Sequence, residues 1–208
     1  MIDIGDYEMN KFVFFGDSVT ESDRNMMDDN DLGRGYVFNL SNLFSKALFF
    51  NRGISGQRVK DLIKRVEKDV ISIQPDYCFI WIGVNDAWLP YLLNQVSSID
   101  TFYNDYNDLV KRIKEESKKT EIVLIKPFAL TIGHVSVKIY EDIKYFRNQT
   151  AEVATLHDLD CIDIKEAVEE KLRYMPANLL FHDGIHPTLE GYEVITKVIE
   201  RYIKEHVK

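Results

Sequence analysis

Short apolar segments alternate with amphipathic ones along the chain, and this alternation restricts the folds that the chain can adopt. Residues 77–82 are the clearest case, because all six are apolar. A segment that is apolar on both sides predicts a parallel strand covered on both faces of a sheet. Further strands are expected at residues 12–15, 48–51, 121–125 and 160–163.

The segments between these strands carry apolar residues at helical spacing, which predicts a helix after each strand. Helices are expected over residues 36–48, 59–66, 100–117, 139–156, 164–172 and 189–202, with Thr188 as the cap of the last one. Such alternation predicts a parallel sheet with helices on both faces and right-handed crossovers. No repeat or low-complexity linker divides the 208 residues, so we expect a single domain, 1–208.

Composition and charge exclude several classes of partner. The net charge is −8 and no long basic run is present, which argues against nucleic acid and against anionic membranes. The first residues lack the basic start and apolar centre of a signal peptide, and no apolar run is long enough to span a bilayer, so a cytoplasmic location is expected. Cys78 and Cys161 are expected to be reduced, and they are too few to form a zinc site.

Polar, glycine-containing turns follow three of the expected strands. They comprise residues 16–18, 51–53 and 83–86, and a late loop adds Asp183 and His186. Because the carboxyl ends of parallel strands open on one edge of a sheet, ligands bind there and these turns are expected to meet.

These turns contain the parts of an acyl-transfer site. The hydroxyl of Ser18 is a weak nucleophile that needs a neighbouring base, and His186 can supply one. Asp183 can fix the tautomer of that histidine. The backbone N–H groups of Ser18 and Gly53 and the side-chain amide of Asn85 can donate to the oxyanion of a tetrahedral intermediate.

Each of these residues also has an ordinary structural explanation. Ser18 can cap a helix, Asp183 and His186 can form a capping turn, and Gly53 can be a simple turn glycine. Asn85 is explained equally well by an Asx turn at a strand end. Taken singly, none of the residues decides between structure and catalysis.

Four ordered sequence blocks carry a family resemblance. They read Gly16-Asp17-Ser18-Val19-Thr20, Asn51-Arg52-Gly53-Ile54-Ser55-Gly56, Gly83-Val84-Asn85-Asp86 and Asp183-Gly184-Ile185-His186-Pro187. In order and content they resemble the blocks of the SGNH hydrolases, also called GDSL esterases and lipases. Many members have a glycine two residues after the threonine of the first block, whereas this chain has Ser22, so the path of the loop at residues 21–34 is undefined.

The resemblance implies a fold and a mechanism. It implies a three-layer α/β/α sandwich around a five-stranded parallel sheet with the flavodoxin-like order 2-1-3-4-5. It also implies that Ser18 is the nucleophile, His186 the base and Asp183 its orienting acid, with an oxyanion hole made by Ser18, Gly53 and Asn85. Neither a metal nor an organic cofactor is implied.

The substrate is less constrained than the reaction. The compact chain resembles small bacterial family members that deacetylate sugars, so a small ester substrate, an acetylated carbohydrate, is favoured. A lysophospholipase or acyl thioesterase is the alternative within the family, and a non-catalytic carbohydrate-binding protein is a third reading. Asp17, Trp88, Tyr91 and Phe128 are candidate substrate contacts, although the aromatic ones fit a core equally well. Family members are often dimers or larger, so the resemblance allows a homo-oligomer.

Overall fold

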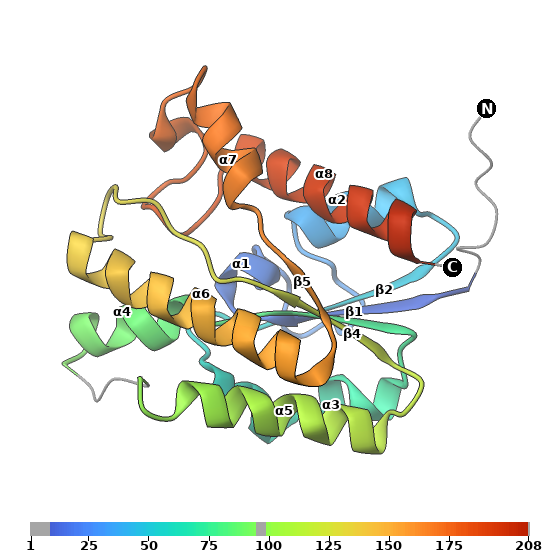
Figure 1. Cartoon of the computed structure of the whole chain (residues 1–208). Coiled ribbons are helices and arrows are strands. Elements are labelled where there is room, and N and C mark those ends of the chain that lie inside the picture. The colour runs from blue at the N-terminus through green and yellow to red at the C-terminus, as the bar shows by residue number, and fades with distance from the viewer. Residues whose placement is uncertain (1–8, 95–98, 208) are drawn as a thin grey trace.

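The central sheet has the predicted strand order. A computed structural model describes residues 9–94 and 99–207, and within them five parallel strands form a sheet in the order β2-β1-β3-β4-β5 (Figure 1). The strands are β1 (Lys11–Gly16), β2 (Leu48–Gly53), β3 (Tyr77–Trp81), β4 (Glu121–Ile125) and β5 (Asp160–Ile162). The α/β fold class and the order 2-1-3-4-5 are therefore confirmed.

Strand β1 lies inside the sheet, which explains its continuous apolar sequence. It pairs with β2 on one side and β3 on the other, so that Gly16 lies opposite both Gly53 and Trp81. The side chains of residues 12–15 are completely buried. Each buried phenylalanine contributes roughly 1.5–3 kcal/mol of hydrophobic stabilisation. This burial holds the carboxyl end of β1, and the turn that follows it, in a fixed place.

Helices cover both faces of the sheet. They are α1 (Ser18–Glu21), α2 (Tyr36–Leu43), α3 (Val59–Asp69), α4 (Val84–Leu92), α5 (Phe102–Glu116), α6 (Val137–His157), α7 (Lys165–Leu172) and α8 (Leu189–His206), with short 3₁₀ turns at Ile71–Ile73 and Ala177–Leu179. Helices α2, α7 and α8 lie above the sheet in Figure 1, while α3 and α5 lie below it, and α6 packs against α4 and α5. Among the described residues, no helix combines the length and hydropathy needed to cross a bilayer.

Several boundaries differ from the sequence prediction, one helix was not predicted, and one cap is confirmed. Strand β2 continues to Gly53 because the ladder with β1 extends through that residue. Helix α2 ends at Leu43, before the predicted end. Residues 84–92 form a helix although Pro90 lies inside it, and proline argues against a helix interior. Thr188 caps α8, since its Oγ1 accepts the N–H of Gly191 at 3.2 Å.

Candidate active site

The turn after β1 separates the cap of α1 from the candidate nucleophile. Asp17 is the cap, because its Oδ1 accepts the N–H of Val19 at 3.0 Å. Ser18 is the first residue of the helix, and its hydroxyl makes no capping bond. Burial raises the pKa of Asp17 to about 7, against the opposing effects of the Val19 N–H and of His186. The sequence therefore has its helix cap and its candidate nucleophile side by side.

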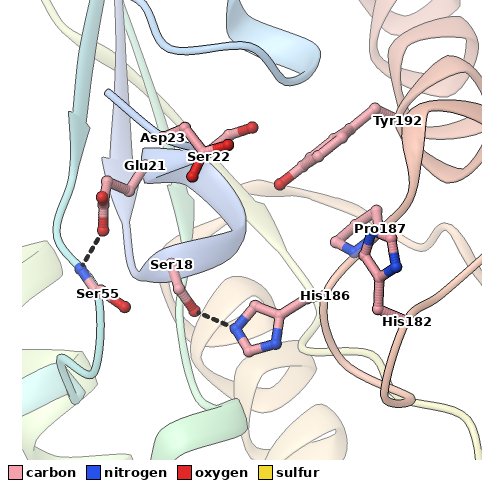
Figure 2. Close-up of a pocket in the computed structure, with 9 residues that line it drawn as sticks. All are labelled: Ser18, Glu21, Ser22, Asp23, Ser55, His182, His186, Pro187 and Tyr192. Atoms are coloured by element: carbon pink, nitrogen blue, oxygen red, sulfur yellow. Dashed lines mark hydrogen bonds between the residues drawn. The ribbon is translucent and has the colours of Figure 1, made fainter. Parts of the chain in front are cut away.

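Ser18, His186 and Asp183 form a continuous hydrogen-bonded chain. Ser18 Oγ lies 2.9 Å from His186 Nε2, and His186 Nδ1 lies 2.7 Å from Asp183 Oδ2 (Figure 2 shows the Ser18–His186 contact). The second oxygen of Asp183 accepts the N–H groups of Ile185 and His186 at 2.9 and 2.8 Å. Burial opposes ionisation of Asp183, but the donors of His186 and Ile185 together hold its pKa below the usual value. The carboxylate is consequently ionised and fixed against the imidazole at neutral pH.

The loop that carries the histidine is held by close backbone packing. Gly184 has φ = +96°, and a Cβ there would lie 2.4 Å from the carbonyl oxygen of Leu130. Glycine is required at such a position, because a side chain would be both strained and obstructed. The ring of Trp88, on α4, lies with its centroid 6.0 Å from that of His186 in an edge-on contact. Trp88 thus borders the imidazole, although it belongs to α4 and not to the loop that carries His186.

The expected role of Gly53 does not fit the structure. Its N–H donates to Oδ1 of the fully buried Asn51 at 2.9 Å, so this hydrogen is already bound within the protein. A Cβ on Gly53 would lie 2.1 Å from the backbone nitrogen of Glu21, so this glycine permits close packing of α1 on β2. The prediction that Gly53 donates to an oxyanion therefore needs correction.

The turn at residues 53–57 offers a different donor. The N–H of Ile54 donates to the carbonyl of Gly16, that of Ser55 to Glu21 Oε2, and that of Gln57 to the carbonyl of Ile54. The N–H of Gly56 donates to no group within the described part of the chain, and Gly56 adopts φ = +76° with open space beside it.

Asn85 and Ser18 provide the remaining donors. One hydrogen of Asn85 Nδ2 binds the carbonyl of Gln57 at 3.0 Å, which leaves the other hydrogen for a ligand. The N–H of Ser18, at the start of α1, has no acceptor among the residues that the structure describes. Ser18, Gly56 and Asn85 therefore each carry an N–H hydrogen that no described residue accepts.

A cavity of about 300 Å³ opens beside the serine and the histidine (Figure 2). Its walls come from α1 and the loop after it, the turn after β2, the loop before α8, and α8 itself. They are formed by Ser18, Glu21, Ser22, Asp23, Ser55, His182, His186, Pro187 and Tyr192. The sequence did not predict Glu21, Asp23 or Tyr192 as wall residues. The departure of residues 21–22 from the family pattern was the signal that this loop takes its own path. Two carboxylates make the cavity acidic.

None of the four predicted substrate contacts is among the residues that line this cavity. Asp17 is only 2% exposed and caps α1, so it cannot face a ligand. Phe128 is 6% exposed and packs on Phe181, which makes it a core residue. Tyr91 is directed toward α6, where its hydroxyl donates to Asp142 at 2.6 Å. Trp88 is the one of the four that contacts a triad residue.

Neither cysteine supplies a nucleophile or a metal ligand at this site. Cys78 and Cys161 are free thiols, as expected. Burial raises the pKa of both, that of Cys161 to about 11, so the thiolate form is not populated at neutral pH. Across residues 9–94 and 99–207, no three His, Cys, Asp or Glu side chains gather as a metal site.

Comparison with known proteins places the chain among ester hydrolases. The model of the GDSL-like lipase/acylhydrolase family matches residues 14–194. The chain is 27% identical to an acetylxylan esterase from Geobacillus stearothermophilus, over 93% of each chain. A crystal structure of that esterase superposes with a TM-score of 0.82 at 28% identity, covering 94% of each chain. A GDSL-like lipase structure from Parabacteroides merdae gives a TM-score of 0.86 at 30% identity, covering 93% of this chain and 95% of the other.

Variants of the Geobacillus esterase add chemical detail. Three solved variants are described as catalytic mutants, and they replace a serine, an aspartate and a histidine. The aspartate and the histidine lie three positions apart in that protein. Asp183 and His186 have the same spacing here.

Proposed function

Since the chain belongs to the GDSL-like lipase/acylhydrolase family, and is thus a serine ester hydrolase, we propose that it removes acetyl groups from carbohydrates. The nucleophile, base and orienting acid in this proposal are Ser18, His186 and Asp183. The observation that carries the proposal is the hydrogen-bonded chain that joins these side chains at the wall of a cavity.

The contacts support a two-step hydrolysis. His186 Nε2 takes the proton of Ser18 Oγ as that oxygen attacks the ester carbonyl. Asp183 holds the imidazole in the tautomer with Nδ1 protonated and stabilises the imidazolium that forms. The leaving alcohol then receives the proton from His186, and a water molecule attacks the acyl-enzyme by the same route in reverse.

The oxyanion hole in this proposal contains one donor that differs from the sequence prediction. The N–H groups of Ser18 and Gly56 and the second hydrogen of Asn85 Nδ2 stabilise the oxyanion. Gly56 replaces Gly53, because the Gly53 N–H is bound to Asn51. The contact between Asn85 and the carbonyl of Gln57 holds the third donor beside the Gly56 turn.

The cavity walls support a small, hydroxyl-rich substrate. Glu21, Ser22, Asp23, Ser55 and His182 surround it with side-chain donors and acceptors. Such walls match the hydroxyl groups of a sugar and disfavour an alkyl chain, whose burial against ionised carboxylates gains no hydrophobic free energy. The similarity to an acetylxylan esterase supports the same substrate class.

A chain-length series tests the substrate class. We expect kcat/KM to fall at least about tenfold from p-nitrophenyl acetate to the octanoate, since the polar cavity does not accept a long acyl chain. Acetate release from acetylated xylo-oligosaccharides should be abolished in the Ser18→Ala variant, which serves as the blank. A rise in kcat/KM toward octanoate would instead favour a lysophospholipase or thioesterase.

A further inference from the structure

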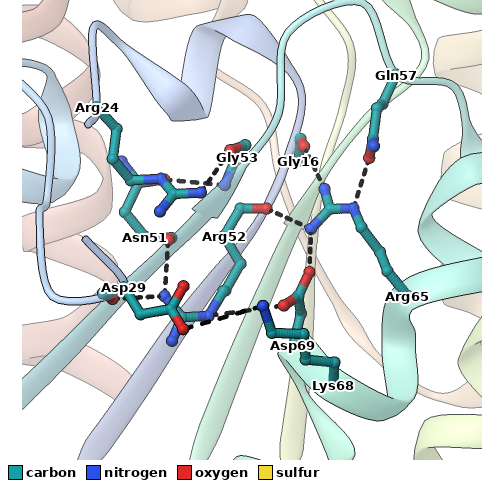
Figure 3. Close-up of polar contacts among 10 residues, drawn as sticks. All are labelled: Gly16, Arg24, Asp29, Asn51, Arg52, Gly53, Gln57, Arg65, Lys68 and Asp69. Carbon is teal, nitrogen blue, oxygen red and sulfur yellow. Dashed lines mark hydrogen bonds and ion pairs between the residues drawn. The ribbon is translucent and has the colours of Figure 1, made fainter. Parts of the chain in front are cut away.

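Arg65 lies on α3, and its guanidinium contacts both the turn that leads into Ser18 and the turn that contains Gly56. Nη2 donates to the carbonyl of Gly16 at 3.0 Å, and Nη1 donates to the carbonyl of Arg52 at 2.9 Å (Figure 3). Nε donates to the side-chain oxygen of Gln57 at 2.5 Å. A single side chain therefore bridges two strand ends and the end of the following turn.

The first contact fixes the nucleophile turn. Gly16 is the last residue of β1 and lies two positions before Ser18. The carbonyl of Gly16 also accepts the N–H of Ile54, so the start of this turn is held by two donors, one from the neighbouring loop and one from α3. A shift of the Gly16 carbonyl would move the peptide that leads into Ser18.

The other two contacts, to Arg52 and Gln57, fix the turn that contains the N–H group of Gly56. Arg52 and Gln57 flank residues 53–56, so Arg65 holds this segment at both ends. Gln57 also accepts the side-chain N–H of Asn85 on its backbone carbonyl. The guanidinium is thereby connected to the donors of Gly56 and Asn85 through one residue.

The environment of Arg65 holds its guanidinium in one orientation. Nη1 also binds Asp69 Oδ2 at 2.6 Å, and the guanidinium carbon lies 4.4 Å from the ring centroid of Phe15. The side chain is 12% exposed. An arginine presents five N–H donors in a rigid plane, whereas a lysine offers one point charge that cannot reach separate acceptors in the same geometry.

From these contacts we propose that Arg65 is a positioning residue for ester hydrolysis, which sets the distance between Ser18 and the oxyanion donors of Gly56 and Asn85. The inference rests on the proposed function of the same site. Donors placed for the transition state act on the chemical step, so their displacement lowers kcat more than it raises KM.

A matched pair of variants tests this role. Arg65→Met keeps the aliphatic stem on Phe15 and removes every hydrogen bond. Arg147→Met is the control, because Arg147 binds the carbonyl of Pro127 at 2.9 Å and Asp163 at 2.7 Å and is 13% exposed. Both variants lose a buried, paired arginine, but only Arg65 contacts the turns around Ser18 and Gly56.

With p-nitrophenyl acetate, at a temperature well below both melting points, we expect Arg65→Met to lower kcat at least about 30-fold and to change KM less than about threefold. Arg147→Met should change kcat less than about threefold. Gln57→Ala, which removes one acceptor of Arg65, should lower kcat severalfold with little change in melting temperature.

The inference fails if the two methionine variants lose kcat equally, or if Arg65→Met raises KM alone. If Arg65→Met does not fold, Gln57→Ala decides, and an unchanged kcat in that variant contradicts the inference. A wild-type enzyme without activity on any acetyl ester would instead contradict the proposed function, so the two failures are distinguishable.

Discussion

The carboxyl group of Asp17 lies at a buried position, where a negative charge is unfavourable. Its side chain is 2% exposed and caps α1, and burial raises its pKa to about 7 from an ordinary value of 3.8. The folded protein keeps this proton to a higher pH than the unfolded chain does. The resulting stabilisation is complete below the unfolded pKa and is lost as the pH rises through the folded pKa.

Asp17→Asn should therefore change how stability depends on pH. Asparagine retains the acceptor for the Val19 N–H but carries no titrating group. We expect the melting temperature of the wild type to fall, relative to the variant, between pH 5 and pH 8, with a loss on the order of 2 kcal/mol in the free energy of unfolding. Thermal melts at both pH values measure the difference, and an equal gap at pH 5 and pH 8 would contradict the expectation.

Asn85 is the proposed oxyanion donor that can be removed by mutation, since the other two proposed donors belong to the backbone. Asn85→Ala should lower kcat on an activated acetyl ester by on the order of 10²–10³, the usual effect of losing one such donor. Steady-state kinetics at constant pH provide the measurement. Unchanged kcat in a folded variant would remove Asn85 from the oxyanion hole.

For single residues, the sequence predicted which side chains meet, but not where each backbone N–H group points. Ser18, His186 and Asp183 were predicted because their residue types and blocks are specific. Gly53 and Gly56 belong to the same block, and both are glycines, so the sequence does not distinguish them. The distinction depends on a single contact, the hydrogen bond of the Gly53 N–H to Asn51.

Among the larger elements, the loop after α1 depends on a side chain of β2. Asn51 is fully buried, and its Nδ2 donates to the carbonyls of Thr20 at 2.7 Å and Leu32 at 2.8 Å. Those carbonyls lie near the two ends of the loop at residues 21–34. One asparagine therefore closes the loop that forms a wall of the cavity.

Asn51→Ala should destabilise the protein, because it leaves buried carbonyls and the Gly53 N–H without partners. We expect a loss of about 3 kcal/mol in the free energy of unfolding. Asn39→Ala is the control, since within the described residues the side chain of Asn39 makes one hydrogen bond, to Thr196, at a partly exposed site. A loss of about 1 kcal/mol or less is expected there. Urea unfolding measures both variants, and equal losses would show that the Asn51 contacts have no special weight.

The spacing of apolar residues predicted whether most segments are helices or strands. It did not predict every boundary of these elements, or the path of the loop at residues 21–34. The apolar pattern placed β3 and β4 because both lie inside the sheet. Helix α4 was not predicted, because Pro90 lies inside it and proline disfavours a helix interior. In the folded protein α4 packs against α6. The path of residues 21–34 depends on the contacts of Asn51, which the sequence does not display.

The charge of the whole molecule bears on which esters reach the site. The chain carries a net charge of −8, and Glu21 and Asp23 add negative charge at the cavity itself. A field of one sign at a cleft repels ligands of the same sign, and salt screens that repulsion. The molecule as a whole therefore favours neutral esters over anionic ones.

We expect kcat/KM for 4-acetoxybenzoate, an anion, to be about tenfold below that for neutral phenyl acetate at low salt. The ratio of kcat/KM for the neutral ester to kcat/KM for the anionic ester should approach one as the salt concentration rises to about 0.5 M. The double variant Glu21→Gln, Asp23→Asn should reduce the ratio, whereas Asp108→Asn, on the exposed surface of α5, should leave it unchanged. A ratio that is independent of salt would contradict a selection by charge.

The most direct test of the central claim is the identification of the residue that a fluorophosphonate modifies. We expect one adduct, on the peptide that contains Ser18, with loss of p-nitrophenyl acetate hydrolysis in proportion to labelling. The Ser18→Ala variant should be neither labelled nor active. An adduct on another residue, or hydrolysis that survives in Ser18→Ala, would show that Ser18 is not the nucleophile.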